Sequence, residues 1–403
     1  MALHPDAELG RDPVAAARFV DDAAAFDELL EEVLPAPFYA LDTEFHRERT
    51  YYARLALVQL AWPGGIALID PLAVDVARLS ELFAGDGVAV LHACDQDLEI
   101  FERACGRVPA RLFDTQIAAG FVGMSSPSLG NLVDKLLGIR LEKGDQLTDW
   151  MHRPLTASQL HYGASDVAHL LDLYEVLHQR LEATGRWQWA VEECATVLSR
   201  TRRSTDPQEA WWKLRQARQL HGKARGVAQE VAAWRERKAR QVDQPLRTVL
   251  SDLAIGSIAH HPPATRAELD AVRSLDGRRV SGALAEELIE AVQAGLRLAS
   301  SELRLPPVPQ GESVAKPAVA LAVAWMQERA RELEIDAAIL ATRADIMGFL
   351  KDPPEGRLAT SWRYELVGEP IRSLVEGTAA LAVSGSNLVL EQRSRIPFSP
   401  VAD

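Results

Sequence analysis

The first 200 residues alternate between short apolar runs, which are typical of buried strands, and longer amphipathic stretches, which are typical of helices. The strand-like runs are 38–45, 55–62, 66–70 and 88–93. The turn signal Pro63-Gly64-Gly65 joins the second run to the third and predicts a hairpin. A helix is expected over 14–34, and another directly after the last run. Strands that cluster first and then alternate with helices predict an α/β domain with a mixed sheet.

The stretch 154–184 has the strongest helical pattern in the chain and predicts one long helix. Thr156 and Gln159 fit a capping box at its start, and Gly185 follows where a C-terminal glycine belongs. Gly163 lies inside the helix, where glycine is about 1 kcal/mol less favourable than alanine. We therefore expect a packing or access reason for Gly163.

Beyond residue 200 the pattern indicates two mostly helical segments, separated by linkers. The linkers are expected at 200–207 and at the proline-rich stretch 303–313, which is typical of an extended chain. The helical segments run from Trp211 to about Leu296 and over 316–386, and the tail after Ser384 is expected to be disordered. These patterns predict three domains, at 14–200, 208–298 and 313–390.

Composition places the chain among intracellular globular proteins. It has 403 residues, of which 47% are hydrophobic and 25% are charged. No apolar run is long enough to span a membrane, and the first residues lack an apolar signal core, so we expect a soluble, cytoplasmic protein. Three widely spaced cysteines, Cys94, Cys105 and Cys194, fit neither a disulfide framework nor a zinc site. They are interpreted as buried free thiols.

The net charge of −13 is unevenly distributed along the chain. Residues 1–200 carry −15, residues 201–300 carry +5 and residues 301–403 carry −3. A basic segment can attract a phosphate backbone. Many modestly basic domains bind no nucleic acid, however, so charge alone leaves the role of the middle segment open.

Two acids interrupt the apolar strand pattern of YALDTEF, residues 39–45. Residues two apart in a strand share a face, so Asp42 and Glu44 point the same way, while Leu41 and Phe45 point into a core. Two like charges so close repel each other unless a cation intervenes. A hard divalent cation such as Mg²⁺ would remove this repulsion. A strand end at which both acids reach water explains the pair equally well.

Two further acidic clusters have a structural reading when each is taken alone. Asp95 and Asp97 follow a strand and open a helix, where acids are favoured by the helix dipole. Tyr162 and Asp166 are four residues apart on one helix face, where a surface hydrogen bond would explain them. Asp114 is interpreted as the cap of the helix that follows it.

Taken together, the clusters are far more specific than they are separately. Two acids on a strand, one at a strand-to-helix turn and a Tyr-x₃-Asp on a later helix supply what a two-metal nuclease needs. Four carboxylates that converge without a cation would repel one another strongly.

The motifs LDTEF, LHACDQDLEIF and QLHYGASDVAHLLDLY resemble those of the tyrosine-containing DEDD 3′–5′ exonucleases, and within them the ribonuclease D family. The resemblance covers roughly residues 36–185 and implies an RNase H-like α/β fold. It implies that Asp42, Glu44, Asp97 and Asp166 hold two Mg²⁺ or Mn²⁺ ions and that Tyr162 orients the attacking water. It also selects Asp97 over Asp95. Gly163 and Ser165 stand where the family commonly has alanine.

The basic segment resembles an HRDC domain, a helical nucleic-acid-binding module, in WWKLRQARQL, VAAWRERKARQVDQP and SIAHHPPATRAELDAV. Its candidate RNA-binding side chains are Lys213, Arg215, Arg218, Lys223, Arg225, Arg235, Arg237, Lys238 and Arg240. The last segment, with RLATSWRYELVGEPIRSLVEG, resembles a second, C-terminal HRDC-like domain. The expected fold is therefore an α/β RNase H-like exonuclease domain followed by two all-α HRDC-type domains.

These resemblances imply a metal-dependent 3′–5′ exoribonuclease that releases nucleoside 5′-monophosphates, with tRNA precursors as its expected substrates. The alternatives are a 3′–5′ DNA exonuclease of the proofreading or repair type and a non-catalytic RNA-binding module on the same fold. The presence of all five site residues argues against the non-catalytic alternative. Neither a membrane nor an obligate protein partner is expected.

Overall fold

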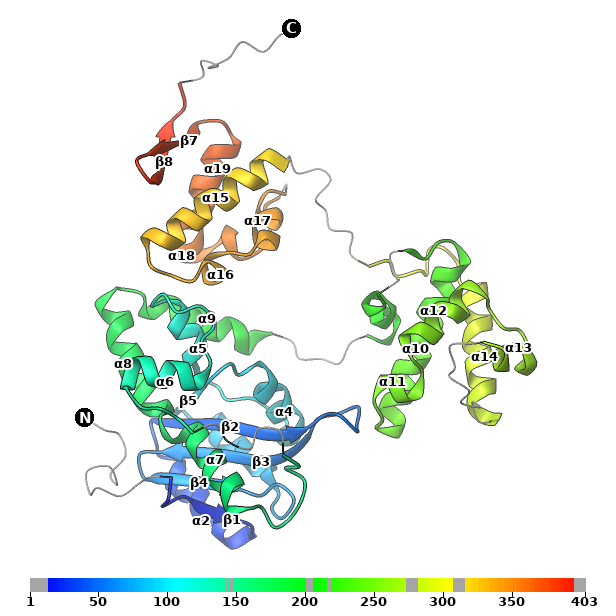
Figure 1. Ribbon diagram of the computed structural model, residues 1–403, viewed down its shortest axis with the longest axis horizontal. Helices are drawn as coiled ribbons and strands as arrows, with labels where there is room; N and C mark the ends of the chain where they lie inside the picture. Colours follow the sequence, from blue (N-terminus) through cyan, green and yellow to red (C-terminus); the bar gives the residue numbers. More distant parts are fainter. Residues whose placement is uncertain are drawn as a thin grey trace.

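The computed structural model describes residues 14–142, 144, 148–200, 206–215, 219–272, 282–306, 316–351 and 353–394. It consists of an α/β part and two mostly helical units (Figure 1). The α/β part contains a six-stranded sheet in the order β1-β4-β3-β2-β5-β6. Its strands are β1 Arg18–Val20, β2 Phe38–His46, β3 Arg54–Trp62, β4 Gly65–Ile69, β5 Val88–Leu91 and β6 Leu112–Asp114.

The sheet is mixed, as the sequence predicted. Strand β3 pairs antiparallel with both β2 and β4, whereas the pairs β1–β4, β2–β5 and β5–β6 are parallel. Trp62 pairs with Gly65 at the end of the β3–β4 hairpin, which confirms the turn expected at this point. The three cysteines are buried and unpaired, which is also confirmed.

Helices cover both faces of the sheet. One face packs on α2 (Ala23–Val33), α3 (Leu79–Ala84) and α4 (Asp95–Cys105). The other face packs on α5 (Thr115–Gly120), α6 (Leu129–Leu137), α7 (Ala157–Ala168) and α8 (Leu170–Ala183), and α9 (Trp187–Ser199) follows against β6. Alternation along the strands assigns each side chain to one of these two cores. Leu41 and Leu60 belong to the first, and Leu57 and Ala61 to the second.

The helix predicted over 14–34 is wrong for its first third. Residues 18–20 form β1, and the helix begins only at Ala23. Asp22 has an extended backbone and its side chain accepts a hydrogen bond from the Ala25 amide, which starts the helix there. Parallel pairing of Val20 with Ile69 holds the preceding residues in the sheet.

The single helix predicted over 154–184 is two helices, α7 and α8, because His169 leaves the helical conformation at φ −113° and ψ 5°. The capping box of Thr156 and Gln159 is confirmed, and Gly185 has the positive φ of 69° expected after a helix end. The packing reason for Gly163 is also confirmed. A Cβ atom there would lie 3.0 Å from Leu57 Cδ2 on the sheet beneath.

The middle unit has its own core and is helical, as predicted. It comprises a 3₁₀ helix at Pro207–Lys213 and the helices α10 Lys223–Val242, α11 Leu246–Val249, α12 Asp252–His260, α13 Arg266–Asp270 and α14 Gly282–Arg297. Helices α10 and α14 touch at two glycines, since a Cβ atom on Gly226 would lie 2.4 Å from the Gly295 carbonyl oxygen. Residues 201–205 of the predicted first linker lie outside the described part of the chain.

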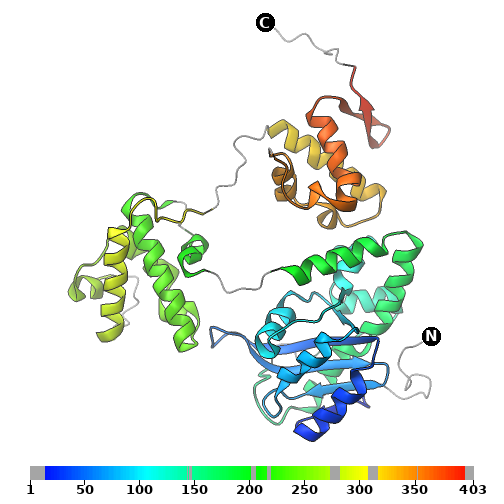
Figure 2. The same ribbon diagram turned by 180° about the vertical axis from the view of Figure 1, so that it is seen from behind.

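The β2–β3 loop of the α/β part reaches α10 of the middle unit (Figures 1 and 2). The Tyr51 hydroxyl donates to Glu236 and accepts from Arg240 Nε at 3.0 Å. The Tyr52 amide donates to Asp243 at 3.1 Å. These contacts dock α10 beside the end of the strand that carries Asp42 and Glu44.

The C-terminal unit is helical over most of its length but not throughout. Its elements are α15 Lys316–Glu332, α16 Ala337–Leu340, α17 Arg343–Phe349, a 3₁₀ turn Arg357–Ala359, α18 Ser361–Arg363, a π-helical turn Tyr364–Gly368, α19 Glu369–Val375, β7 Ala379–Ser384 and β8 Asn387–Gln392. The expectations of an all-α unit and of disorder directly after Ser384 are therefore wrong. Gly385 turns the chain with a φ of 64°, and Leu381 and Leu390 of the resulting hairpin pack against the core. Residues 307–315 of the proline-rich stretch and the end of the tail, 395–403, lie outside the described residues.

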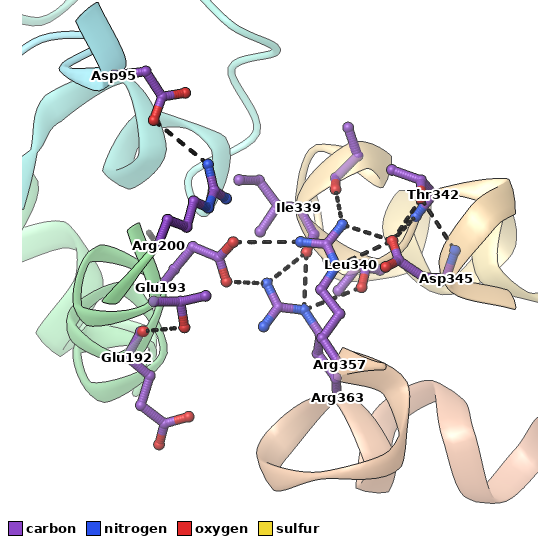
Figure 3. Close-up of polar contacts among 12 residues, drawn as sticks. Asp95, Glu192, Glu193, Arg200, Ile339, Leu340, Thr342, Asp345, Arg357 and Arg363 are labelled. Carbon is purple, nitrogen blue, oxygen red and sulfur yellow. Dashed lines mark hydrogen bonds and ion pairs between the residues drawn. The ribbon is translucent and has the colours of Figure 1, made fainter. Parts of the chain in front are cut away.

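The C-terminal unit packs on the α/β part through one continuous apolar cluster. Trp362 stacks on Trp189 of α9 with a centroid distance of 4.8 Å, and its edge meets Phe121. Arg363 and Arg357 reach across this contact to Glu193 of α9 (Figure 3). The Asp336 amide donates to the Gly120 carbonyl at 2.8 Å, so the backbones also meet.

Candidate active site

Asp42 and Glu44 lie on the sheet face that packs against α7. In the β2–β3 ladder Asp42 is opposite Gln59 and Glu44 is opposite Leu57, and both acids are half-buried. Leu41 is buried in the opposite core, as predicted. Phe45 is only half-buried, because a register shift between Glu44 and Phe45 ends the regular alternation there.

Asp97 is in the first turn of α4, which follows β5, and β5 pairs in parallel with β2. It is buried, and its carboxylate accepts a hydrogen bond from the Thr43 hydroxyl. Burial raises the pKa of Asp97 to about 6. Asp95, by contrast, is exposed and pairs with Arg200 at 3.5 Å. Of the two acids in this motif, therefore, only Asp97 faces β2.

Tyr162 and Asp166 come from consecutive turns of α7. The Tyr162 hydroxyl donates to the Asp166 carboxylate, but burial outweighs this bond and raises the pKa of Asp166 to about 7. The Tyr162 ring lies 6.0 Å from that of Trp150, centroid to centroid. A cavity of about 660 Å³ opens beside this pair and is also lined by the start of α6 and by Arg140. It is large enough for a nucleotide.

The four acids act on one another electrostatically. Burial raises the pKa of Asp42 well above its usual range, and the charges of Asp97, Asp166 and Glu44 raise it further. The pKa of Glu44 rises to about 8, first through burial and then through Asp166 and Asp97. Like charges held this close favour a cation between them.

The donor set fits a hard divalent cation, since all four side chains offer carboxylate oxygens. In the described part of the chain, no three His, Cys, Asp or Glu side chains are already arranged to hold one ion. Three of the four acids accept hydrogen bonds: Asp97 from the Thr43 hydroxyl, Asp166 from Tyr162, and Asp42 from the Thr43 backbone.

Two contributors to this arrangement were not predicted from the sequence. Thr43, between the two acids of β2, anchors Asp97, and Trp150 packs beside Tyr162. No local pattern in the sequence singles out either residue. The structural role expected for Asp114 is confirmed, because it accepts from the Gln116 amide at 2.8 Å and the Ile117 amide at 3.1 Å and caps α5.

The candidate RNA-binding residues of the middle unit differ widely in exposure. Arg235 is buried and donates to the Leu250 carbonyl and to Asp252, so its interpretation as an RNA contact is corrected. Three further candidates are half-buried: Arg225 donates to the Leu220 carbonyl, Lys238 pairs with Glu287, and Arg240 pairs with Glu236. Arg218 lies outside the described residues. The exposed candidates are Lys213, Arg215, Lys223 and Arg237.

The mixed sheet, its strand-borne acids and the Tyr-x₃-Asp helix define the class of 3′–5′ exonucleases. The 3′–5′ exonuclease family model matches residues 17–182, and the HRDC domain model matches residues 224–292. The model for the HRDC domain thus covers the middle unit, and the assignment of the C-terminal unit as a second HRDC-type domain stays a prediction.

Two relatives named ribonuclease D align over most of the chain. The one from Zymomonas mobilis is 34% identical over 385 residues, which is 92% of this chain and 97% of the relative. The one from Jannaschia sp. is 36% identical over 361 residues, which is 87% of this chain and 93% of the relative.

Two solved structures share the fold. Escherichia coli RNase D, an exoribonuclease involved in structured RNA processing, is 31% identical, with a TM-score of 0.79 over 89% of this chain and 98% of that one. The catalytic core of RRP6 from Trypanosoma brucei is 26% identical, with a TM-score of 0.58 over 70% of this chain and 79% of that one.

The chain therefore belongs to the ribonuclease D family, and its activity is that of a 3′–5′ exoribonuclease that depends on divalent metal ions. The RNase H-like fold and the exoribonuclease function inferred from the sequence are both confirmed. Among the described residues, no helix is both long enough and apolar enough to cross a membrane.

Proposed function

We propose that RNA is hydrolysed from its 3′ end at the site formed by Asp42, Glu44, Asp97 and Asp166, with two Mg²⁺ or Mn²⁺ ions as cofactors. The observation that carries the proposal is the placement of the acids: Asp42 and Glu44 share the face of β2 that packs against α7, the helix of Asp166, and Asp97 bonds to Thr43 between them. The charges of Asp97, Asp166 and Glu44 also raise the pKa of Asp42. Bound divalent ions supply positive charge that activates a water and stabilises the leaving oxygen at phosphorus.

The side chains have distinct roles in this proposal. Asp42, whose pKa all three other acids raise, would be the central ligand of the ions. Tyr162 lines the cavity beside Asp166, so its hydroxyl is assigned to orient the attacking water. The cavity admits the terminal nucleotide, and the released product is a nucleoside 5′-monophosphate.

The proposed substrates are the 3′ ends of tRNA precursors and other structured RNAs. Support comes from Escherichia coli RNase D, which is described as acting in structured RNA processing and aligns with 89% of this chain. Further support comes from Lys213, Arg215, Lys223 and Arg237, which expose positive charge on the middle unit. Contacts of this kind hold a nucleic-acid backbone independently of its sequence.

The test is hydrolysis of a 3′-extended tRNA with Mg²⁺ or Mn²⁺, in the presence and absence of a chelator. Asp42→Asn should lower the rate by about 10³-fold or more, because the acids act as a unit, and should leave folding intact. Asp95→Asn is the matched control, since Asp95 is an exposed acid of the neighbouring helix, and it should keep the wild-type rate. Unchanged hydrolysis by Asp42→Asn would overturn the site. Equal rates on the tRNA and on an unstructured RNA would overturn the proposed preference.

A further inference from the structure

Gln59 is a buried amide with no hydrogen-bond partner, and it lies next to the proposed metal site. Its exposed fraction is 0%, and neither Nε2 nor Oε1 is bonded. An unpaired polar group in a protein interior costs about 1–3 kcal/mol. A leucine or methionine would avoid this cost at the same position. We therefore expect a polar partner for this amide among the neighbouring side chains.

The surroundings of Gln59 limit which group can be its hydrogen-bond partner. Its two neighbours across the sheet are Asp42 in β2 and Leu68 in β4. Above the sheet lies α7, where a Cβ atom on Gly163 would be 3.5 Å from Gln59 Cγ. The backbone groups of these strands and of α7 are occupied by their own ladders and helix. Asp42 is the polar side chain among these neighbours.

The distance between the two residues suits a direct contact. Directly opposed residues on one face of an antiparallel pair have Cβ atoms about 4.5–5.5 Å apart. A glutamine side chain spans this gap easily. The small residue at Gly163 lets α7 close over the amide, so that water does not compete for it. Leu57, the next residue on this face of β3, is apolar and lies opposite Glu44, so Asp42 alone of the two strand acids has an amide across from it.

We propose that Gln59 is a positioning residue for the metal site, and that its Nε2 group donates a hydrogen bond to the Asp42 carboxylate when that carboxylate faces a divalent cation. This inference rests on the proposed function of Asp42. With the cation, the bond fixes one rotamer of Asp42 and leaves its other oxygen lone pairs for the ion. Residues that orient metal ligands in this way commonly change metal affinity or activity 10- to 100-fold when replaced.

The test compares Gln59→Met, which removes the amide at nearly constant volume, with Leu57→Met, which changes only apolar packing one step along the same strand face. Mn²⁺ binding is measured by calorimetric titration of the full-length protein, and the Mg²⁺ concentration for half-maximal hydrolysis is measured in parallel. Gln59→Met should raise the dissociation constant for Mn²⁺ and the Mg²⁺ concentration for half-maximal hydrolysis, each about 10-fold. The KM for RNA at saturating Mg²⁺ should not change. Leu57→Met should stay within about twofold of the wild type for both.

Stability separates a positioning role from a packing role. In chelator the melting temperature of Gln59→Met should equal or exceed that of the wild type, because an unpaired buried amide has been removed. Saturating Mn²⁺ should raise the melting temperature of Gln59→Met less than it raises the melting temperature of the wild type. Gln59→Leu is the second variant if Gln59→Met does not fold, with the same expected results. Mn²⁺ affinity within twofold of the wild type in a folded variant would overturn the role of Gln59. Wild-type Mn²⁺ affinity in Asp42→Asn would instead overturn the metal site itself.

Discussion

Replacing Glu193 by alanine should loosen the docking of the C-terminal unit on the α/β part. The side chains of Glu193 and Arg363 are only 6% and 7% exposed, and they pair across this contact (Figure 3). Removing one partner of a buried ion pair typically costs 3–5 kcal/mol, because the other charge stays buried without compensation. Arg363 would keep its bonds to the carbonyls of Ile339 and Leu340. We therefore expect a loss at the lower end of that range, about 3 kcal/mol.

The assay is urea denaturation followed by tryptophan fluorescence. Trp189 and Trp362, two of the nine tryptophans, stack across the same contact with an interplanar angle of 12°, so part of the emission change follows its separation. Glu192→Ala is the matched control, since Glu192 precedes Glu193 on α9 but is exposed, and its carboxylate accepts a hydrogen bond from Ser361. This control should cost less than about 1 kcal/mol.

A second variant tests whether the orphaned charge is the cause. Combining Glu193→Leu with Arg363→Met removes both charges of this pair at similar volume, which is commonly neutral or stabilising. Arg357, which also pairs with Glu193, keeps its ion pair with Asp345. The double variant should therefore recover most of the stability lost in Glu193→Ala. Equal stabilities of Glu193→Ala and Glu192→Ala would refute the reasoning, and so would a double variant as weak as the single one.

Two further predictions concern the acids and the basic unit. In chelator, the free energy of unfolding should fall as the pH rises from about 4 to 8. Asp97, Asp166 and Glu44 have folded-state pKa values of about 6, 7 and 8, which are above those of the unfolded chain. The folded protein therefore binds more protons than the unfolded chain in this window and loses this advantage as the pH rises. In thermal scans, the melting temperature of Asp42→Asn should rise relative to that of the wild type as the pH rises. Adding Mg²⁺ should make this difference in melting temperature smaller. A difference in melting temperature that stays constant with pH would contradict the proposed repulsion. Arg237→Ala should weaken RNA binding and reduce the slope of log affinity against log salt by about 1, whereas Arg297→Ala, at an exposed position of the same unit outside the candidate set, should leave the slope unchanged. Equal slopes for the two variants would remove Arg237 from the interface.

The strands at the centre of the fold were predictable because their signals are local. Alternation and the turn at Pro63-Gly64-Gly65 lie within the hairpin itself. Strand β1 was missed because three residues acquire their conformation only by pairing with β4, some 50 residues further on. The break between α7 and α8 at His169 was missed because the apolar periodicity continues through it.

The candidate site divides in the same way. Asp42, Glu44, Tyr162 and Asp166 could be predicted as candidates because the spacing within each motif already places them on one face. Thr43 and Gln59 have no such signal, since each acquires its meaning from a distant partner. Thr43 meets Asp97 across 54 positions of sequence. The importance of Gln59 depends on its register against Asp42, which only the sheet reveals.

Charge alone overestimates the RNA-binding surface, and α10 shows why. Its basic residues were equivalent in the sequence, yet the helix has an inward face, a docking face and an exposed face. Arg235 turns inward to Asp252, and Arg240 joins Glu236 and Tyr51 at the contact with the β2–β3 loop. A guanidinium held in such bonds must lose them before it can bind a phosphate, whereas Arg237 on the exposed face need not. The docking contacts thus leave α10 a narrower basic surface than its composition suggests, beside the strand that carries Asp42 and Glu44.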